Sequence, residues 1–174
     1  YINFSVSNQF YMISNKYNID FHSLREKMID GYERNKNIPK AGFAAGPCLL
    51  KDTMQLTSFT DNNFILGQIA MSINEGLPAF IIDTLRKKIK LRNRKVGILG
   101  LSFKAEIDDI RDSLSFKLIK LLIFNGCKVL VSDEYYKHKK HISKERLIKN
   151  SEIIILAVPH KSYKKCKIPK SKIL

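Results

Sequence analysis

A cysteine, a lysine and an aspartate stand close together in the stretch AGFAAGPCLLKDTMQL, which runs from Ala41 to Leu56. Cys48 lies at the expected start of a helix, and Lys51 and Asp52 follow three and four residues later, which puts the three side chains on one helix face. Helix N-termini and neighbouring ammonium groups favour a thiolate over a thiol. The small residues before the cysteine let a ligand approach the backbone. The group therefore combines a nucleophile, a cation and a base, as covalent catalysis requires.

These residues also have a purely structural interpretation, which their types alone favour. A free cysteine is most often a small core residue, and Lys51 with Asp52 can be an ordinary solvated pair. The other cysteines, Cys127 and Cys166, lie far from Cys48 in the sequence. Three well-separated cysteines argue against a disulfide framework or a zinc knuckle and indicate a reducing compartment. We therefore expect a cytoplasmic protein without a structural metal.

The composition limits the classes of partner. The chain has 174 residues, of which 44% are hydrophobic and 27% charged, which predicts one ordinary domain or two small ones. Its net charge is +15, but the lysines are not interleaved with aromatic residues as a base-stacking surface requires. The longest apolar run, Ile153 to Val158, is too short to span a bilayer, and no signal-peptide pattern opens the chain. We expect neither nucleic acid nor membrane as a partner. Because the chain begins at Tyr1, we expect it to be a piece of a longer protein.

The first half of the chain is predicted to be helical. Ile2, Val6 and Phe10 recur at helical spacing and predict a helix over residues 2–14, with Asn8 partly off this apolar stripe. Further helices are predicted over about residues 20–30, 48–59 and 64–90.

The last of these helices is long enough to connect two lobes. Gly76 and Pro78 should bend it. Apolar residues lie on more than one of its sides, which predicts burial on more than one side. We expect this helix to join the two parts of the chain and to form a homodimer interface.

After a basic linker, Lys87–Lys95, the pattern changes to strands alternating with helices. The predicted strands are Val96–Leu101, Lys128–Ser132 and Ile153–Val158, with helices over 114–122 and 144–149 and a last strand beginning near Ile173. This alternation predicts a parallel sheet with right-handed crossovers. The expected fold class is α/β, with a helical region over residues 1–92 and a truncated Rossmann-like domain over residues 93–174.

Ligands of such sheets bind at the carboxyl ends of the strands. Phe103, Lys104 and Arg111 follow the first predicted strand, and a lysine with an arginine there could bind phosphate. Arg111 could instead close its own loop by pairing with an acidic neighbour. The candidates are Asp108, Asp109 and Asp112. The segment VGILG has no GxGxxG motif, so its glycines are equally consistent with close packing alone.

Two stretches together resemble the UDP-glucose/GDP-mannose dehydrogenase family. They are GFAAGPCLLKDTMQL followed by NEGLP, and KVGILGLSFKAEIDDIRDS. The resemblance covers nearly the whole chain. It implies two successive NAD-dependent oxidations at C6 of a nucleotide sugar, through a cysteine thiohemiacetal and a thioester. The form AAGPC, in place of the family's commoner GFGGSC, resembles the branch that oxidises UDP-N-acetyl-D-mannosamine, with UDP-glucose as the alternative substrate.

The resemblance also implies roles for individual residues. Cys48 matches the nucleophile, Asp52 the carboxylate that helps activate it or the hydrolytic water, and Lys51 the lysine beside it near the cofactor. Arg111 matches a contact to NAD. The matching substrate contacts are Arg34, which would reach a neighbouring subunit's substrate, Ala41, Gly42, Phe43, Ala44, Ala45, Phe103 and Lys104. No metal is implied.

The chain departs from the family pattern by lacking the first Rossmann domain and the last strand with its arginine. NAD would then have no complete site, and the chain alone is expected to be inactive. Two alternatives stay open: a non-catalytic remnant that binds nucleotide or dimerises, and a basic nucleic-acid binder. A metal site at His138 and His141 is disfavoured because lysines flank both residues. A protease-type pair of Cys48 with His160 is disfavoured because no third group orients it.

Overall fold

The computed structural model describes residues 1–172, and the strand predicted near Ile173 lies outside them. The chain divides into two compact units, Tyr1–Leu77 and Pro78–Leu174, which we describe separately. The division falls inside a continuous helix, at the proline where a bend was expected. This division does not test the predicted bend of the helix or the predicted domain boundary between residues 92 and 93, and both stay predictions.

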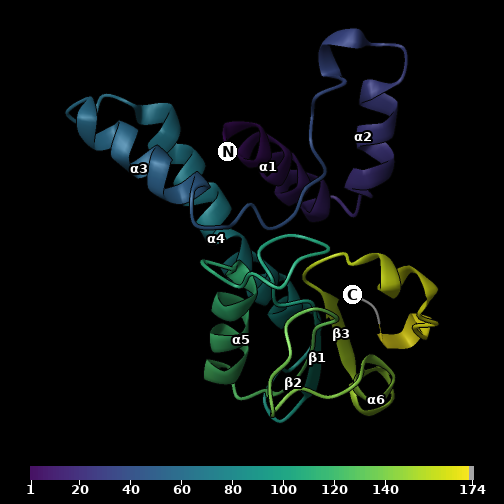
Figure 1. Cartoon of the computed structure of the whole chain (residues 1–174). Coiled ribbons are helices and arrows are strands. Elements are labelled where there is room, and N and C mark those ends of the chain that lie inside the picture. The colour runs from purple at the N-terminus through teal and green to yellow at the C-terminus, as the bar shows by residue number, and fades with distance from the viewer. Residues whose placement is uncertain (173–174) are drawn as a thin grey trace. The chain divides into compact units, whose positions relative to one another are not determined.

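The first unit is helical, as predicted (Figure 1). Its elements are α1 (Ile2–Lys16), α2 (Phe21–Ile29), the 3-10 turn η1 (Glu33–Asn35), α3 (Leu49–Phe59) and the first half of α4 (Ile65–Lys88). Asp20 caps α2, because its carboxylate accepts hydrogen bonds from the backbone N–H groups of His22 and Ser23. Asp61 and Asn62 adopt positive φ angles and end α3. These residues therefore set the start of α2 and the end of α3.

Helix α1 buries its polar face rather than its apolar stripe. Ser7 and Asn8 are fully buried, whereas Val6 and Phe10 are each 42% exposed. The buried polar side chains are hydrogen-bonded: Ser7 Oγ donates to the carbonyl of Pro39, and Asn8 bonds to Gly42. Burial of polar groups is tolerated because these bonds replace those to water. The apolar spacing predicted the helix correctly but not the face that packs.

Helix α4 buries one stripe of residues, not several sides as expected. The stripe consists of Gly67, Ala70, Asn74, Leu77, Pro78, Ile82 and Leu85. Ile65, Leu66 and Ile69 are exposed. By length and composition alone α4 could cross a membrane, but buried helices of soluble proteins meet the same test. Asn74 on α4 is fully buried, and its side chain is hydrogen-bonded to Asn8. Packing of α4 inside a protein explains a buried polar side chain of this kind.

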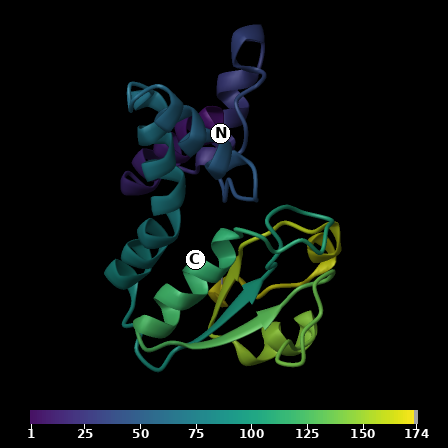
Figure 2. The ribbon, with the colours of Figure 1, turned by 60° about the vertical axis from the view of Figure 1, so that its left-hand side comes forward.

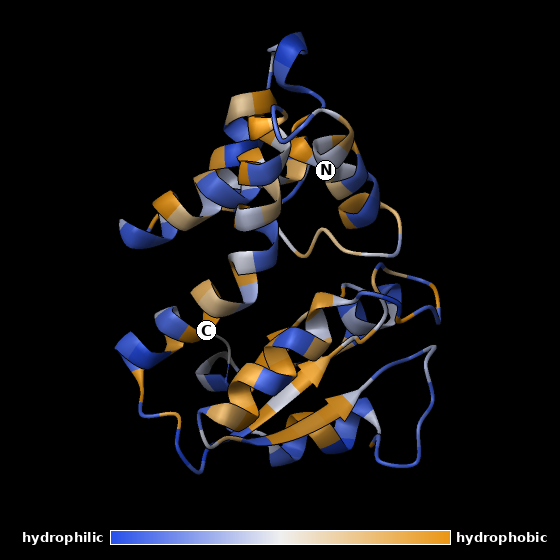
Figure 3. Cartoon of the chain, turned by 90° about the vertical axis from the view of Figure 1, so that its left-hand side faces the viewer, coloured by the Kyte–Doolittle hydropathy of each residue, from blue (hydrophilic) through white to orange (hydrophobic). Residues whose placement is uncertain are grey.

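The second unit is a three-stranded parallel sheet with helices on both faces (Figures 1 and 2). Its elements are β1 (Lys95–Leu99), α5 (Leu114–Phe124), β2 (Lys128–Ser132), α6 (Lys144–Asn150), β3 (Ile153–Leu156) and the 3-10 turns η2 (Lys161–Lys165) and η3 (Lys170–Lys172). The strand order is β2-β1-β3, with β1 in the centre. The strands are strongly hydrophobic, as Figure 3 shows, which is typical of a parallel sheet covered on both faces. The predicted α/β fold is confirmed.

The glycine of β1, Gly97, permits close packing, one of the two interpretations that the sequence allowed. A Cβ atom at Gly97 would lie 2.4 Å from Leu147 Cδ2 and 2.5 Å from Ser151 Oγ. Leu147 is fully buried and belongs to a core cluster with Leu99. Helix α6 therefore lies against β1 at a distance that only glycine allows.

Candidate functional site

Cys48 is exposed at the N-terminus of α3, so the structural interpretation of a buried cysteine is wrong. It is the N-cap residue of the helix, and Lys51 and Asp52 occupy the first turn. Lys51 Nζ lies 3.6 Å from Asp52 Oδ1, and both side chains are mostly exposed. The predicted thiol, ammonium and carboxylate thus share one accessible helix end.

The loop before Cys48 presents unpaired backbone donors. Gly42 N–H donates to Asn8 Oδ1, at 2.8 Å. By contrast, no group in the described part of the chain accepts a hydrogen bond from the N–H groups of Phe43, Ala44, Ala45 or Gly46. Ala44 is nevertheless buried. Because buried N–H groups are rarely left without a partner, this loop has the features of a ligand-binding backbone.

A pocket that could hold a ligand borders the first turns of α3. A pocket of about 420 Å³ lies between the start of α1 and the face of α3 that carries Asp52. Its lining comprises Tyr1, Ile2, Asn3, Leu49, Asp52, Thr53, Leu56 and Phe64. The Asp52 carboxylate therefore borders a cavity. Arg34, also predicted from the family resemblance, is exposed in η1 and lines neither this pocket nor the loop.

In the second unit, Phe103 and Lys104 lie on the loop at the carboxyl end of β1, where a ligand is expected. Lys104 Nζ lies 5.9 Å from the centre of the Phe103 ring, a cation–π distance. Phe103 N–H donates to the carbonyl of Asp109, at 2.9 Å, which closes the loop on itself. The pair thus presents an aromatic face and an ammonium group at the sheet edge.

Arg111 makes the loop-closing ion pair that the sequence offered as its alternative. Its guanidinium Nε and Nη2 donate to the Asp109 carboxylate, with Nη2 2.7 Å from Oδ2. The side-chain and backbone hydrogen bonds from Arg111 hold the pKa of the Asp109 carboxyl below its usual range. The guanidinium remains 71% exposed, so its predicted contact to a cofactor phosphate stays a prediction.

A buried network that the sequence did not reveal joins the loops after the three strands. His160 has no exposed side-chain surface, and its Nδ1 accepts a hydrogen bond from Glu106 N–H, at 3.0 Å. Its Nε2 lies 3.3 Å from Asp133 Oδ2 and 3.4 Å from Ser102 Oγ. The Asp133 carboxylate also accepts the N–H of Leu101, at 2.5 Å. The network therefore fixes the backbone on both sides of Phe103 and Lys104.

The carboxylates of this network are held in the charged form. Burial alone would raise the pKa of the Asp133 carboxyl, but hydrogen bonds from the backbone N–H groups of Tyr136, Leu101 and Tyr135 outweigh it and lower that pKa. The backbone N–H of Lys161 lowers the pKa of Glu106 in the same way. The Asp133 carboxylate has no exposed surface, so its charge is compensated by hydrogen bonds within these loops.

The remaining candidates do not form catalytic sites. His138 and His141 lie 5.3 Å apart between ring centres, but no group of three metal-ligating side chains occurs among residues 1–172. Both ring nitrogens of His160 are hydrogen-bonded to residues of the second unit, so neither is available to Cys48. Cys127 is buried at the start of β2, and burial raises the pKa of its thiol.

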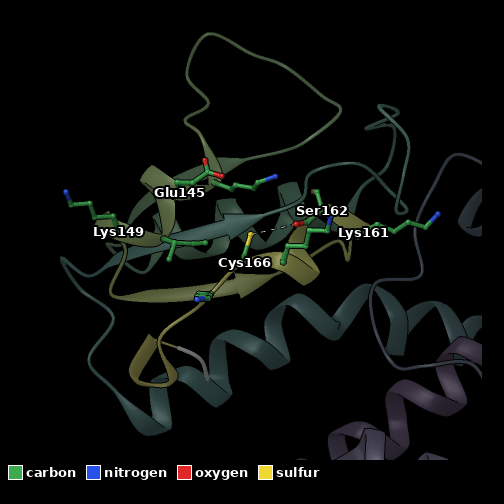
Figure 4. Close-up of a pocket in the computed structure, with 9 residues that line it drawn as sticks. Glu145, Lys149, Lys161, Ser162 and Cys166 are labelled. Atoms are coloured by element: carbon green, nitrogen blue, oxygen red, sulfur yellow. Dashed lines mark hydrogen bonds between the residues drawn. The ribbon is translucent and has the colours of Figure 1, made fainter.

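A further pocket, of about 650 Å³, lies between α6 and η2 (Figure 4). Its lining is dominated by lysines: Lys144, Glu145, Ile148, Lys149, Lys161, Ser162, Lys165, Cys166 and Lys167. In the close-up, Lys149 and Lys161 extend away from each other, and Cys166 lies between them. None of the side chains predicted as site residues lines this pocket.

The fold and these loops define a class of protein: a Rossmann-like α/β unit that follows a helical unit with an exposed cysteine at a helix start. Residues 97–173 match the UDP-binding domain of the UDP-glucose/GDP-mannose dehydrogenase family. This match agrees with the resemblance to the same family that the sequence motifs carry.

Curated relatives agree with this similarity, one of them over nearly the whole chain. The UDP-N-acetyl-D-mannosamine dehydrogenase of Pyrococcus horikoshii is 29% identical over 94% of this chain and 40% of the relative. The UDP-glucose 6-dehydrogenase of Rickettsia bellii is 31% identical over 59% of this chain and 26% of the relative. The chain spans about 40% of the length of the mannosamine dehydrogenases that it matches.

Solved structures share the fold. A UDP-D-ManNAc dehydrogenase from Pyrococcus horikoshii superposes with a TM-score of 0.83 and 27% identity, over 95% of this chain and 40% of that chain. A UDP-glucose dehydrogenase from Pyrobaculum islandicum, at 23% identity, gives a TM-score of 0.88 over 99% of this chain and 44% of that chain. The helical unit and the sheet unit thus both have counterparts in nucleotide-sugar dehydrogenases.

Proposed function

We propose that this chain is the C-terminal part of an NAD-dependent dehydrogenase that oxidises C6 of UDP-N-acetyl-D-mannosamine to a carboxylate. The observation that carries the proposal is the exposed Cys48 at the start of α3, next to a loop with unpaired N–H groups. The family match and the mannosamine dehydrogenase relatives support it. UDP-glucose is the second candidate substrate, supported by relatives that oxidise it.

The proposed mechanism uses Cys48 as a covalent catalyst. Its thiolate adds to the C6 aldehyde, forming a C–S bond while the carbonyl oxygen takes up a proton to give a thiohemiacetal. NAD, when bound, accepts the hydride that C6 loses in each oxidation. Loss of the second hydride from C6, together with release of the hydroxyl proton to a base or to water, converts the thiohemiacetal to a thioester. Water then attacks the thioester carbon and the thiolate leaves, with Asp52 accepting the proton of the water.

The substrate would be bound by backbone and cationic groups. The unpaired N–H groups of Phe43 to Gly46 are suited to the oxygens of the sugar or pyrophosphate. Phe103 can stack on the uracil ring, and Lys104 can pair with a phosphate. Arg34 would act on the substrate of a neighbouring subunit.

NAD fits this chain only in part. Lys51 and Arg111 would supply cations to its phosphates, but the described residues contain no glycine-rich dinucleotide loop between a strand and a helix. We therefore propose that most of the cofactor site belongs to a part of the protein outside this chain. The chain by itself should then be inactive. A cytoplasmic setting is proposed because the three cysteines are free, as is typical of a reducing compartment.

We propose a homodimer through the long helix, and the exposed apolar side chains of the first unit support it. Leu66 and Ile69 on α4 are exposed, as are Val6 and Phe10 on α1. Replacing Ile69 by Asp should convert the dimer to a monomer in analytical ultracentrifugation. An unchanged sedimentation coefficient would exclude this face as the interface. Ile123→Asp, at an exposed apolar residue of α5, is the matched control.

The decisive experiment uses the longer protein that contains this chain. NADH formation is followed with UDP-N-acetyl-D-mannosamine and with UDP-glucose, in the wild type, in Cys48→Ser and in the control Cys166→Ser. Two NADH per sugar, abolished or stalled only in Cys48→Ser, would establish the function and its substrate. No NADH with Cys48 intact would leave a nucleotide-binding remnant, and binding that weakens steeply with salt and ignores Cys48 would indicate a nucleic-acid binder.

A further inference from the structure

We infer that Asn8 is a positioning residue that holds the substrate loop in its binding conformation. This inference rests on the proposed function, because it assigns to Asn8 the task of presenting the unpaired N–H groups of residues 43–46 to the nucleotide sugar. Asn8 lies on α1, far in sequence from the loop, and its side chain is fully buried.

The side chain of Asn8 binds both polar backbone groups of one loop residue. Its Oδ1 accepts the N–H of Gly42, at 2.8 Å, and its Nδ2 donates to the carbonyl of Gly42, at 3.0 Å. A primary amide is the shortest side chain that offers an acceptor and a donor side by side. Gly42 is therefore fixed in position and in orientation by a single partner.

A second asparagine holds the first. Asn8 Nδ2 donates its other hydrogen to Asn74 Oδ1, at 2.9 Å, and Asn74 Nδ2 donates to the carbonyl of Tyr1, at 3.2 Å. The Gly42 N–H can only donate, so Oδ1 of Asn8 must be the atom that faces it. The network thus has one arrangement of its amide groups, and both asparagines are buried without exposed surface.

The clamp acts where the loop changes direction. Gly42 has a φ of +155°, a conformation that favours glycine, and the residues just after it carry the unpaired N–H groups. Because Asn8 satisfies the Gly42 backbone inside the protein, the following N–H groups are left for a ligand. The loop is tied at a second point, where Ser7 Oγ donates to the carbonyl of Pro39, at 2.8 Å. That bond lies further from the unpaired N–H groups and serves as the internal comparison.

The test compares Asn8→Ala with Ser7→Ala in the longer protein. Asn8→Ala should raise KM for the UDP-sugar at least about tenfold, with kcat within about threefold of the wild type and KM for NAD unchanged. Ser7→Ala, which removes a buried bond from the same helix turn, should leave KM for the UDP-sugar unchanged. Should Asn8→Ala not fold, Asn74→Ala replaces it, because it removes the support of Asn8 while keeping both bonds to Gly42, and a smaller rise in the same KM is expected.

The inference is overturned if KM for the UDP-sugar is unchanged in the folded variant, or if kcat and thermal stability fall while KM stays the same. A wild type that forms no NADH would defeat the proposed function instead. The role of Asn8 is then decided by calorimetric titration with the UDP-sugar, in which Asn8→Ala should raise Kd at least about tenfold and Ser7→Ala should not.

Discussion

The buried ring of His160 should control the stability of the loop that carries Phe103 and Lys104. In His160→Leu, Glu106 N–H loses its acceptor and Asp133 loses a donor, since these were bound at 3.0 and 3.3 Å. Leaving a buried polar group without its partner costs about 1–3 kcal/mol. For the two groups together the sum is about 2–6 kcal/mol. We expect the lower part of this range, about 2–4 kcal/mol, because the Asp133 carboxylate keeps its hydrogen bonds from backbone N–H groups. In His160→Asn, the amide Oδ1 stands where Nδ1 of histidine stood, so only the second bond is lost and about half of this cost is expected.

Amide hydrogen exchange of the peptide spanning residues 100–107 measures this effect locally. A loss of about 2–4 kcal/mol corresponds to about 30- to 700-fold faster exchange for His160→Leu, with His160→Asn in between. His141→Asn is the matched control, because His141 lies outside the network and contacts the carbonyl of Tyr136. Exchange as slow in His160→Leu as in the wild type would refute the reasoning that these bonds hold the loop.

Two further predictions concern the stability of the second unit. The pKa of the Asp133 carboxyl in the folded state lies below its ordinary value of 3.8. The stabilisation that this carboxylate provides is therefore fully present above about pH 4 and is lost as the pH falls through the lower folded-state pKa. Asp133→Asn should remove this part of the acid dependence of the free energy of unfolding, measured by urea titrations at a series of pH values. Gly97→Ala should lower the free energy of unfolding by about 1–3 kcal/mol, because its Cβ would meet Leu147 at 2.4 Å. Gly76→Ala, in the part of α4 that belongs to the first unit and with nothing within 4 Å, is the control and should be neutral or stabilising in the same urea titration.

Local patterns were enough to predict the elements. The helices predicted over residues 2–14, about 20–30, 48–59, 64–90, 114–122 and 144–149 match the observed helices within a few residues. The strand Lys128–Ser132 agrees at both ends, because β-branched residues between a glycine turn and an aspartate leave little alternative. The position of Cys48 at a helix start followed from the same kind of local signal.

The residues that the sequence did not reveal act over long distances in the chain. Asn8 lies off the apolar stripe of α1, and its partners Gly42 and Asn74 are 34 and 66 residues away. His160 similarly meets groups 27 to 58 residues away. A lone polar residue gives no periodic signal, so its burial and its partner emerge only when the chain is folded. The apolar stripe of α1 misled for the same reason, since spacing does not say which face a neighbour will cover.

The exposed apolar residues of α1 and α4 have a consequence for how this chain behaves in concentrated solution. The chain carries a net charge of +15, so two copies repel each other while their apolar faces attract at short range. At low ionic strength the repulsion reaches across roughly 30 Å at 0.01 M salt, but only across about 3 Å at 1 M. Added salt should therefore promote self-association of this chain, even though it weakens every ion pair on its surface. The colloidal stability of the chain thus depends on the excess of its positive side chains over its negative ones.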